Sequence, residues 1–74
     1  MSRTLSGKRV VSILCKYFGF AVVHHRGSHC KLEHKTQQGK VVTIVPIHRE
    51  LSAGTLGGVL ELAKIDEKDF WKHV

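Results

Sequence analysis

The N-terminal part of the chain has the hydrophobic periodicity of an amphipathic helix. Apolar side chains recur every three or four residues between residues 7 and 18, and lysine, arginine and serine occupy the opposite face. Ser6 precedes this stretch with a side chain suited to an N-cap, and Gly19 follows it at a position where glycine commonly ends a helix. The pattern predicts a helix over residues 7–18 whose apolar face covers a hydrophobic core.

Three strand-like segments follow, separated by short polar turns. Residues 20–26 are rich in β-branched and aromatic side chains, and residues 29–34 alternate between apolar and polar positions. Residues 40–45 are again β-branched until Pro46 ends the run. Because the connections are short and contain glycine, the segments are expected to form a meander of three antiparallel strands.

The C-terminal part returns to a helical pattern. Apolar residues form one stripe between residues 53 and 64, with Ser52 as an N-cap, and Asp66 precedes a short terminal helix. The order α-β-β-β-α predicts an α+β fold in two layers, a three-stranded antiparallel sheet with both longer helices on one face. Double-stranded-RNA-binding domains share this order of elements. They usually carry lysines at the start of the last long helix, where this chain has residues 52–55, Ser-Ala-Gly-Thr.

Length and composition restrict the class of protein. The chain has 74 residues, of which 42% are hydrophobic and 24% charged, as expected for a single small globular domain over residues 1–74. No apolar run approaches the roughly 18 residues of a membrane span, and the stretch from Met1 to Leu5 predicts no signal peptide. Cys15 and Cys30 are too few for a disulfide framework, so we expect reduced thiols in a cytoplasmic protein.

The charge is uneven along the chain. Lysine and arginine number 12 against 6 aspartate and glutamate residues, for a formal net charge of +6. Residues 1–49 hold nine basic residues and one acidic residue, whereas residues 50–74 hold three basic and five acidic residues. A basic surface of this kind suits a polyanion such as nucleic acid, and it equally suits a solvated surface that keeps a small protein soluble.

The segment from Arg26 to Lys31 has the strongest potential for chemistry. The glycine turn Gly27-Ser28 delivers His29 to the start of a strand, on its polar face, with Arg26 before it and Lys31 after it. An imidazole can accept or donate a proton near neutral pH, and neighbouring cations bind phosphate. On RNA these groups suffice without a metal, because the 2′-hydroxyl is an internal nucleophile. From the residues alone, an ordinary surface histidine remains an alternative.

The other histidines and the cysteines have less specific signals. His48 follows the third strand and is either a second proton-transfer group or a structural or RNA-contacting residue. His24 and His25 face opposite sides of one strand, and one of them is expected to be partly buried. Cys30 is on the inner face and is not expected to be a nucleophile. No recognisable zinc spacing is present, so no metal site is predicted.

The aromatic residues are expected to serve the core rather than to stack on bases. Tyr17, Phe18 and Phe20 flank the junction between the first helix and the first strand, and Phe70 lies in the terminal helix. The indole of Trp71 is expected at the rim of the core.

An ordered series of short motifs resembles the HicA (YcfA-like) family of bacterial messenger-RNA interferase toxins. The resemblance covers roughly residues 6–72 and is specific through the order of its pieces rather than through any one of them. The pieces are Ser6-Gly7-Lys8-Arg9-Val10-Val11, Gly19-Phe20, Gly27-Ser28-His29, Val45-Pro46-Ile47-His48, Glu50-Leu51-Ser52-Ala53-Gly54-Thr55-Leu56 and Leu60-Glu61-Leu62-Ala63-Lys64-Ile65-Asp66.

The resemblance implies a double-stranded-RNA-binding-like fold and ribosome-independent cleavage of messenger RNA, with one catalytic histidine that falls on His29. It also implies a HicB-type antitoxin, as in a type II toxin–antitoxin system, which masks the active surface. Two departures stand out. Cys30 replaces a second histidine found in many members, and Gly57 and Gly58 stand where many carry a basic residue after Gly-Thr-Leu.

The residues and the resemblance together predict a metal-independent endoribonuclease toxin that needs no cofactor and no membrane. The residues expected to contact RNA are Lys8, Arg9, Arg26, Gly27, Ser28, Lys31 and His48. Two other classes stay open at this point: a non-catalytic RNA-binding module on the same basic face, and an interaction protein whose basic face pairs with an acidic partner.

Overall fold

The structure, a computed structural model, describes residues 4–74. Met1, Ser2 and Arg3, the start of the stretch expected to carry no signal peptide, lie outside the described residues. The elements are α1 (Gly7–Tyr17), β1 (Ala21–Arg26), β2 (His29–Thr36), β3 (Gly39–Pro46), α2 (Ala53–Ala63) and α3 (Glu67–Trp71). The predicted α+β fold and the predicted element order are confirmed.

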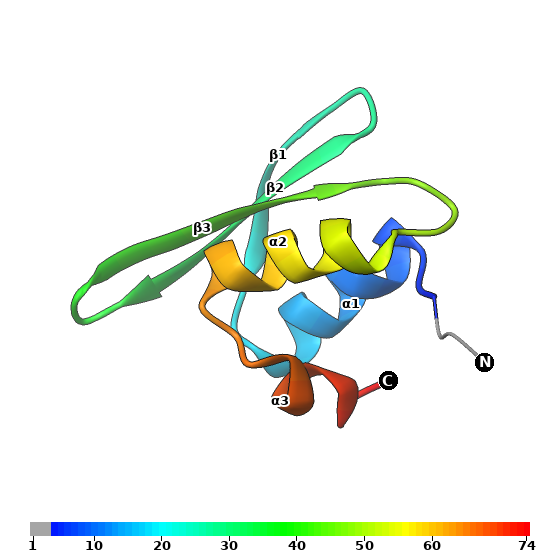
Figure 1. Cartoon of the computed structure of the whole chain (residues 1–74). Coiled ribbons are helices and arrows are strands. Elements are labelled where there is room, and N and C mark those ends of the chain that lie inside the picture. Colours follow the sequence, from blue (N-terminus) through cyan, green and yellow to red (C-terminus); the bar gives the residue numbers. More distant parts are fainter. Residues whose placement is uncertain (1–3) are drawn as a thin grey trace.

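The three strands form one antiparallel sheet in the order β1-β2-β3. Two-residue turns join them, and Gly27 in the first turn has a φ of 58°, a value that glycine adopts without strain. The β1–β2 pairing is irregular between Val22 and His24, so that Val23 is an extra residue in the edge strand. Both hairpin ends extend beyond the helices, in different directions (Figure 1).

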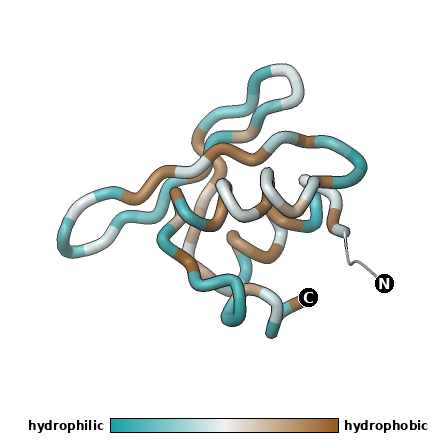
Figure 2. Tube along the Cα trace, in the orientation of Figure 1, coloured by the Kyte–Doolittle hydropathy of each residue, from teal (hydrophilic) through white to brown (hydrophobic). Residues whose placement is uncertain are grey.

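Both longer helices cover the same face of the sheet, and α3 lies at the end of the helical layer away from the sheet (Figure 1). Hydrophobic residues gather where the strands cross the helices, while much of both hairpin tips is hydrophilic (Figure 2). Inside, Thr43 is 1% exposed and its hydroxyl donates a 2.8 Å hydrogen bond to the Val59 carbonyl of α2. The buried hydrophobic residues are Val10, Ile13, Leu14, Phe20, Cys30, Leu32, Val45, Leu51, Leu56, Val59, Leu60, Ala63 and Phe70.

The helix ends are set by the predicted local signals. The Ser6 hydroxyl accepts a hydrogen bond from the Arg9 N–H at 3.0 Å, and the Ser52 hydroxyl accepts one from the Thr55 N–H at 3.1 Å. The Asp66 carboxylate accepts one from the Lys68 N–H at 2.8 Å. Gly19 follows α1 with a φ of 77°, as expected of a glycine just past a helix end.

One aromatic prediction is wrong. Tyr17 was expected in the core, yet its side chain is 47% exposed and stacks on His73 with 4.2 Å between ring centroids. Tyr17 is the last residue of α1, and its ring lies beside the C-terminal tail on the surface instead of under the sheet. Phe20 is buried, Phe18 is half-buried, and Trp71 is half-buried against Phe70, as expected for core and rim positions.

Candidate functional site

His29 lies on the open face of the sheet, at the first position of β2 after the Gly27-Ser28 turn. It pairs with Arg26 of β1 on one side and with Pro46 of β3 on the other. Residues directly opposite each other in antiparallel strands share a sheet face, so these three side chains form one row. His29 is exposed, whereas the next residue, Cys30, is buried against the helices. The predicted placement of His29 on the polar face is confirmed.

A second row lies beside the first, two residues farther along β2. Lys31 pairs with His24 of β1 and with Ile44 of β3. Lys31 is exposed, and so is Ile44, whose side chain is 46% exposed. The structure therefore brings the predicted cations Arg26 and Lys31 to the same face as His29, next to an apolar side chain.

The hydrogen-bond register explains how Pro46 can stand beside His29. The Ile47 N–H donates to the Ser28 carbonyl at 2.6 Å, so Ser28 and Ile47 form a hydrogen-bonded pair. Hydrogen-bonded and non-hydrogen-bonded pairs alternate, which makes His29–Pro46 a non-hydrogen-bonded pair. Such a position needs no N–H from proline, and it brings opposite side chains closest together. The imidazole therefore has the rigid Pro46 ring as its neighbour.

The start of α1 is fixed to the same place from the other side. The Gly7 N–H donates a 2.9 Å hydrogen bond to the His48 carbonyl. Gly7 is buried, and a Cβ at this position would overlap the Pro46 carbonyl oxygen and come within 2.8 Å of the Ile47 Cα. Three motifs that are far apart in the sequence thus meet at one junction: the Gly27-Ser28-His29 turn, the Pro46–His48 segment and the N-terminus of α1.

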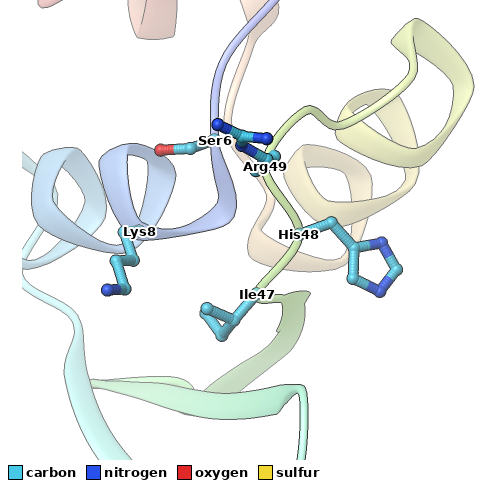
Figure 3. A pocket seen from close by; sticks show the side chains of 5 residues that line it. All are labelled: Ser6, Lys8, Ile47, His48 and Arg49. Atoms are coloured by element: carbon cyan, nitrogen blue, oxygen red, sulfur yellow. The ribbon is translucent and has the colours of Figure 1, made fainter.

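This junction borders a pocket of about 380 Å³, which we call the α1–β3 pocket and which is lined by Ser6, Lys8, Ile47, His48 and Arg49. Lys8 reaches it from α1, and the last three residues come from the segment that follows β3 (Figure 3). The His48 ring is directed to the opposite side of that segment from Lys8 (Figure 3). Of the two predicted helix cations, Lys8 lines this pocket and Arg9 is exposed on α1 outside its lining.

The sequence reasoning missed Arg49 and Ser6 as members of a site. Arg49 directly follows the Val45–His48 motif in the basic part of the chain, which was the available signal. The sequence predicts Ser6 only as a helix cap, and the structure confirms the cap. Its hydroxyl oxygen accepts from Arg9, which leaves the hydroxyl proton free to be donated into the pocket.

The acidic charge near the open face is neutralised. Glu33 is the one acidic residue in the three strands, and its carboxylate lies 3.3 Å from the Lys40 ammonium. It pairs with Val42, two rows away from Arg26 and His29. The end of the sheet that holds His29 therefore has a net positive charge.

The remaining histidines and cysteines are separated by the fold. His24 and His25 occupy opposite faces as predicted, but both are exposed, so the expected partial burial of one of them is wrong. All six residues of β1 are exposed, whereas β2 and β3 supply the buried residues Cys30, Leu32, Thr43 and Val45. Burial raises the pKa of the Cys30 thiol above its ordinary value, and the nearby Cys15 thiol adds to this shift. Within residues 4–74 the structure has no group of three or more His, Cys, Asp or Glu side chains placed to hold a metal ion.

Comparison with known families identifies this arrangement. The family model of the HicA toxin of bacterial toxin–antitoxin systems matches residues 7–65, most of the chain and every segment of the junction except Ser6. The chain belongs to the HicA toxin family. Its role is therefore that of a toxin with an antitoxin as its partner. No curated protein matches the sequence. Within residues 4–74, no helix has the length and apolar character that crossing a membrane requires.

Proposed function

We propose that this HicA toxin is a metal-independent endoribonuclease that cleaves messenger RNA in the cytoplasm, and that the whole chain of 74 residues forms one catalytic domain. The observation that carries the proposal is the row Arg26–His29–Pro46 on the open sheet face. It places an exposed imidazole beside a guanidinium group on a surface that no helix covers.

The proposed reaction is an attack of a ribose 2′-hydroxyl on the adjacent phosphorus. The new 2′-O–P bond forms as the P–O5′ bond breaks, which leaves a 2′,3′-cyclic phosphate and a 5′-hydroxyl. One proton leaves the 2′-oxygen and one is gained by the 5′-oxygen, so a single imidazole can serve at either step. His29 is proposed as that group. The cyclic phosphate, or the product of its hydrolysis, is the expected end of the reaction.

Arg26 and Lys31 are proposed to bind the phosphate on which negative charge develops. Arg26 lies directly opposite His29, and Lys31 is two residues along β2 on the same face. A guanidinium group binds a phosphate through paired N–H donors, and an ammonium group adds a point charge. Charge stabilisation of this kind is commonly the largest contribution to phosphoryl chemistry. Gly27 and Ser28 offer backbone without bulk at the turn, where the sugar–phosphate chain has to pass.

The proposed partner is a HicB-type antitoxin that covers the open face. Ile44 is exposed beside Lys31 on this face, so a partner with apolar and acidic groups would bury the isoleucine side chain and neutralise the lysine charge. Such a partner would compete with RNA for the same residues.

The test compares His29→Ala with His25→Ala. His25 is also exposed, but it pairs with Cys30 and so belongs to the opposite face of the sheet from His29. We expect His29→Ala to lower the cleavage rate by about 10²- to 10⁴-fold, as for loss of a general acid–base group, with an unchanged circular dichroism spectrum. His25→Ala should cleave like the wild type, and EDTA should have no effect.

Growth arrest and messenger-RNA decay after induced expression provide the cellular measurement. Both should follow the wild type and His25→Ala, and both should be lost with His29→Ala. Equal toxicity of all three proteins would remove His29 from the mechanism, and EDTA-sensitive cleavage would reject the metal-free route. Binding of intact RNA without any product would favour the non-catalytic RNA-binding module.

A further inference from the structure

The α1–β3 pocket is lined by two cations, Lys8 and Arg49, that form no ion pair within residues 4–74. Within residues 4–74 the ion pairs join Lys40 to Glu33 and Lys72 to Asp69, so neither Lys8 nor Arg49 is in an ion pair there. The nearest acidic residue in the sequence, Glu50, accepts a hydrogen bond from Thr4 and lines a neighbouring hollow, to which Arg49 also contributes without an ion pair between the two. The pocket itself is lined by no carboxylate. Its chemistry suits an anion.

The pocket is adjacent to His29 but separate from it. Ile47 connects the two sites. It lines the pocket, and its N–H donates a hydrogen bond to the Ser28 carbonyl in the turn that precedes His29. The row that contains His29 ends at Pro46, the residue before Ile47. His29 lies on the open face and the pocket lies at the end of β3 beside α1, so a polyanion that passes over His29 would reach the pocket by continuing round that end of β3.

We propose that the α1–β3 pocket binds a backbone phosphate of the RNA other than the one that is cleaved. The proposal rests on the proposed function, which it extends from the reacting phosphate to a neighbouring one. Arg49 offers paired N–H donors, Lys8 offers an ammonium group, and the Ser6 hydroxyl has a free proton to donate. With a volume of about 380 Å³ the pocket is at the small end of ligand sites, suited to a phosphate with its sugar rather than to a whole base pair.

This subsite adds a requirement on the substrate that the row Arg26–His29–Pro46, which we call the catalytic row, does not impose alone. A substrate must carry a negative charge at one particular link beside the scissile link. The charge contributes to binding and not to the chemical step, so its loss should raise KM and leave kcat nearly unchanged.

The experiment uses RNA oligonucleotides of mixed sequence in which every 2′-hydroxyl except one is methylated, so that only one link can be cleaved. A neutral methylphosphonate then replaces the phosphate on the 5′ side, on the 3′ side or at a distant link. We expect one of the two adjacent replacements to raise KM about tenfold, the usual effect of losing a charged hydrogen bond, and the distant one to have little effect.

The variants Lys8→Ala and Arg49→Ala connect the effect to the pocket. In each variant the fully charged oligonucleotide should bind more weakly than it binds to the wild type. A methylphosphonate at the sensitive link should then cause no further rise in KM. Lys16→Ala is the matched control, because it removes an exposed lysine from the opposite end of the same helix. It should keep the wild-type response, and circular dichroism should show that all three variants are folded.

Binding of the same oligonucleotides to the His29→Ala protein, measured by fluorescence anisotropy, separates this proposal from the proposed function. A position-specific loss of affinity in His29→Ala, together with a wild-type protein that cleaves none of the oligonucleotides, would reject the nuclease and keep the phosphate subsite. Cleavage with the same KM for all methylphosphonate positions would overturn the subsite and keep the nuclease. Persistence of the position effect in Lys8→Ala and Arg49→Ala would also overturn it.

Discussion

Replacing Gly7 with alanine tests whether the junction depends on close backbone contact. The glycine lies in the first turn of α1 and its N–H donates to the His48 carbonyl at 2.9 Å. An alanine methyl group would overlap the Pro46 carbonyl oxygen and lie 2.8 Å from the Ile47 Cα. All of these neighbours are backbone atoms, so the methyl group cannot be accommodated by turning a side chain. The helix start has to move away from the Pro46–His48 segment.

The expected magnitude follows from three contributions. Steric overlap in a packed interior costs about 1–3 kcal/mol, and loss of the hydrogen bond costs about 1 kcal/mol more. Alanine returns at most about 1 kcal/mol through its higher helix propensity. The net destabilisation is about 1–3 kcal/mol. In a chain of 74 residues each kcal/mol shifts Tm by roughly 4–8 °C, so the change is easily measured.

Gly58→Ala is the matched control within the same protein. Gly58 is an exposed glycine inside α2, and a Cβ there would have no other group within 4 Å. We expect this variant to be more stable than the wild type by up to about 1 kcal/mol. Urea titration and thermal unfolding of the three proteins measure the difference. A Gly7→Ala protein as stable as the wild type would refute the close-contact explanation, because helix propensity alone predicts that both variants gain stability.

Three further predictions concern the core. Thr43→Val removes the hydroxyl that donates to the Val59 carbonyl, so the free energy of unfolding should fall by about 1 kcal/mol in urea titration, while Thr43→Ser should keep the hydrogen bond. The raised pKa of the Cys30 thiol means that the folded protein holds this proton at pH values where the unfolded chain has lost it. Stability should therefore fall as pH rises above the ordinary thiol pKa of 9.0, and less steeply in Cys30→Ala. Thiol labelling should modify exposed Cys15 first and Cys30 only after unfolding, whereas equal rates would contradict the burial of Cys30.

Features whose determinants are local could be predicted from the sequence alone. Ser6 and Ser52 cap their helices because a hydroxyl needs only the N–H groups of the next turn. Alternation in β2 placed His29 outward and Cys30 inward, since the side-chain period of a strand is fixed by its backbone. The row that supports the proposed chemistry could therefore be assembled from hairpin geometry.

Features that depend on distant segments could not be predicted in the same way. His25 faces the helical side of the sheet by alternation, yet it is exposed because it lies at the end of edge strand β1, in the hairpin that extends beyond the helices (Figure 1). Tyr17 follows the apolar periodicity of α1, but it is the last residue of the helix and stacks on His73 of the distant C-terminal tail at the surface. Lys8 and Arg49 line the same pocket because the start of α1 lies next to the segment after β3. Neither segment alone specifies that contact.

The junction is held together by backbone groups, and the proposed chemistry resides in exposed side chains. The bonds from Ile47 to Ser28 and from Gly7 to His48 involve no side-chain atom. The proposed functional side chains His29, Lys8 and Arg49 are exposed, so replacing them removes charge or a proton donor without opening a cavity. Loss of activity in those variants can therefore be attributed to the missing functional group. Loss of activity in Gly7→Ala would instead result from displacement of the junction that holds the catalytic row next to the phosphate pocket.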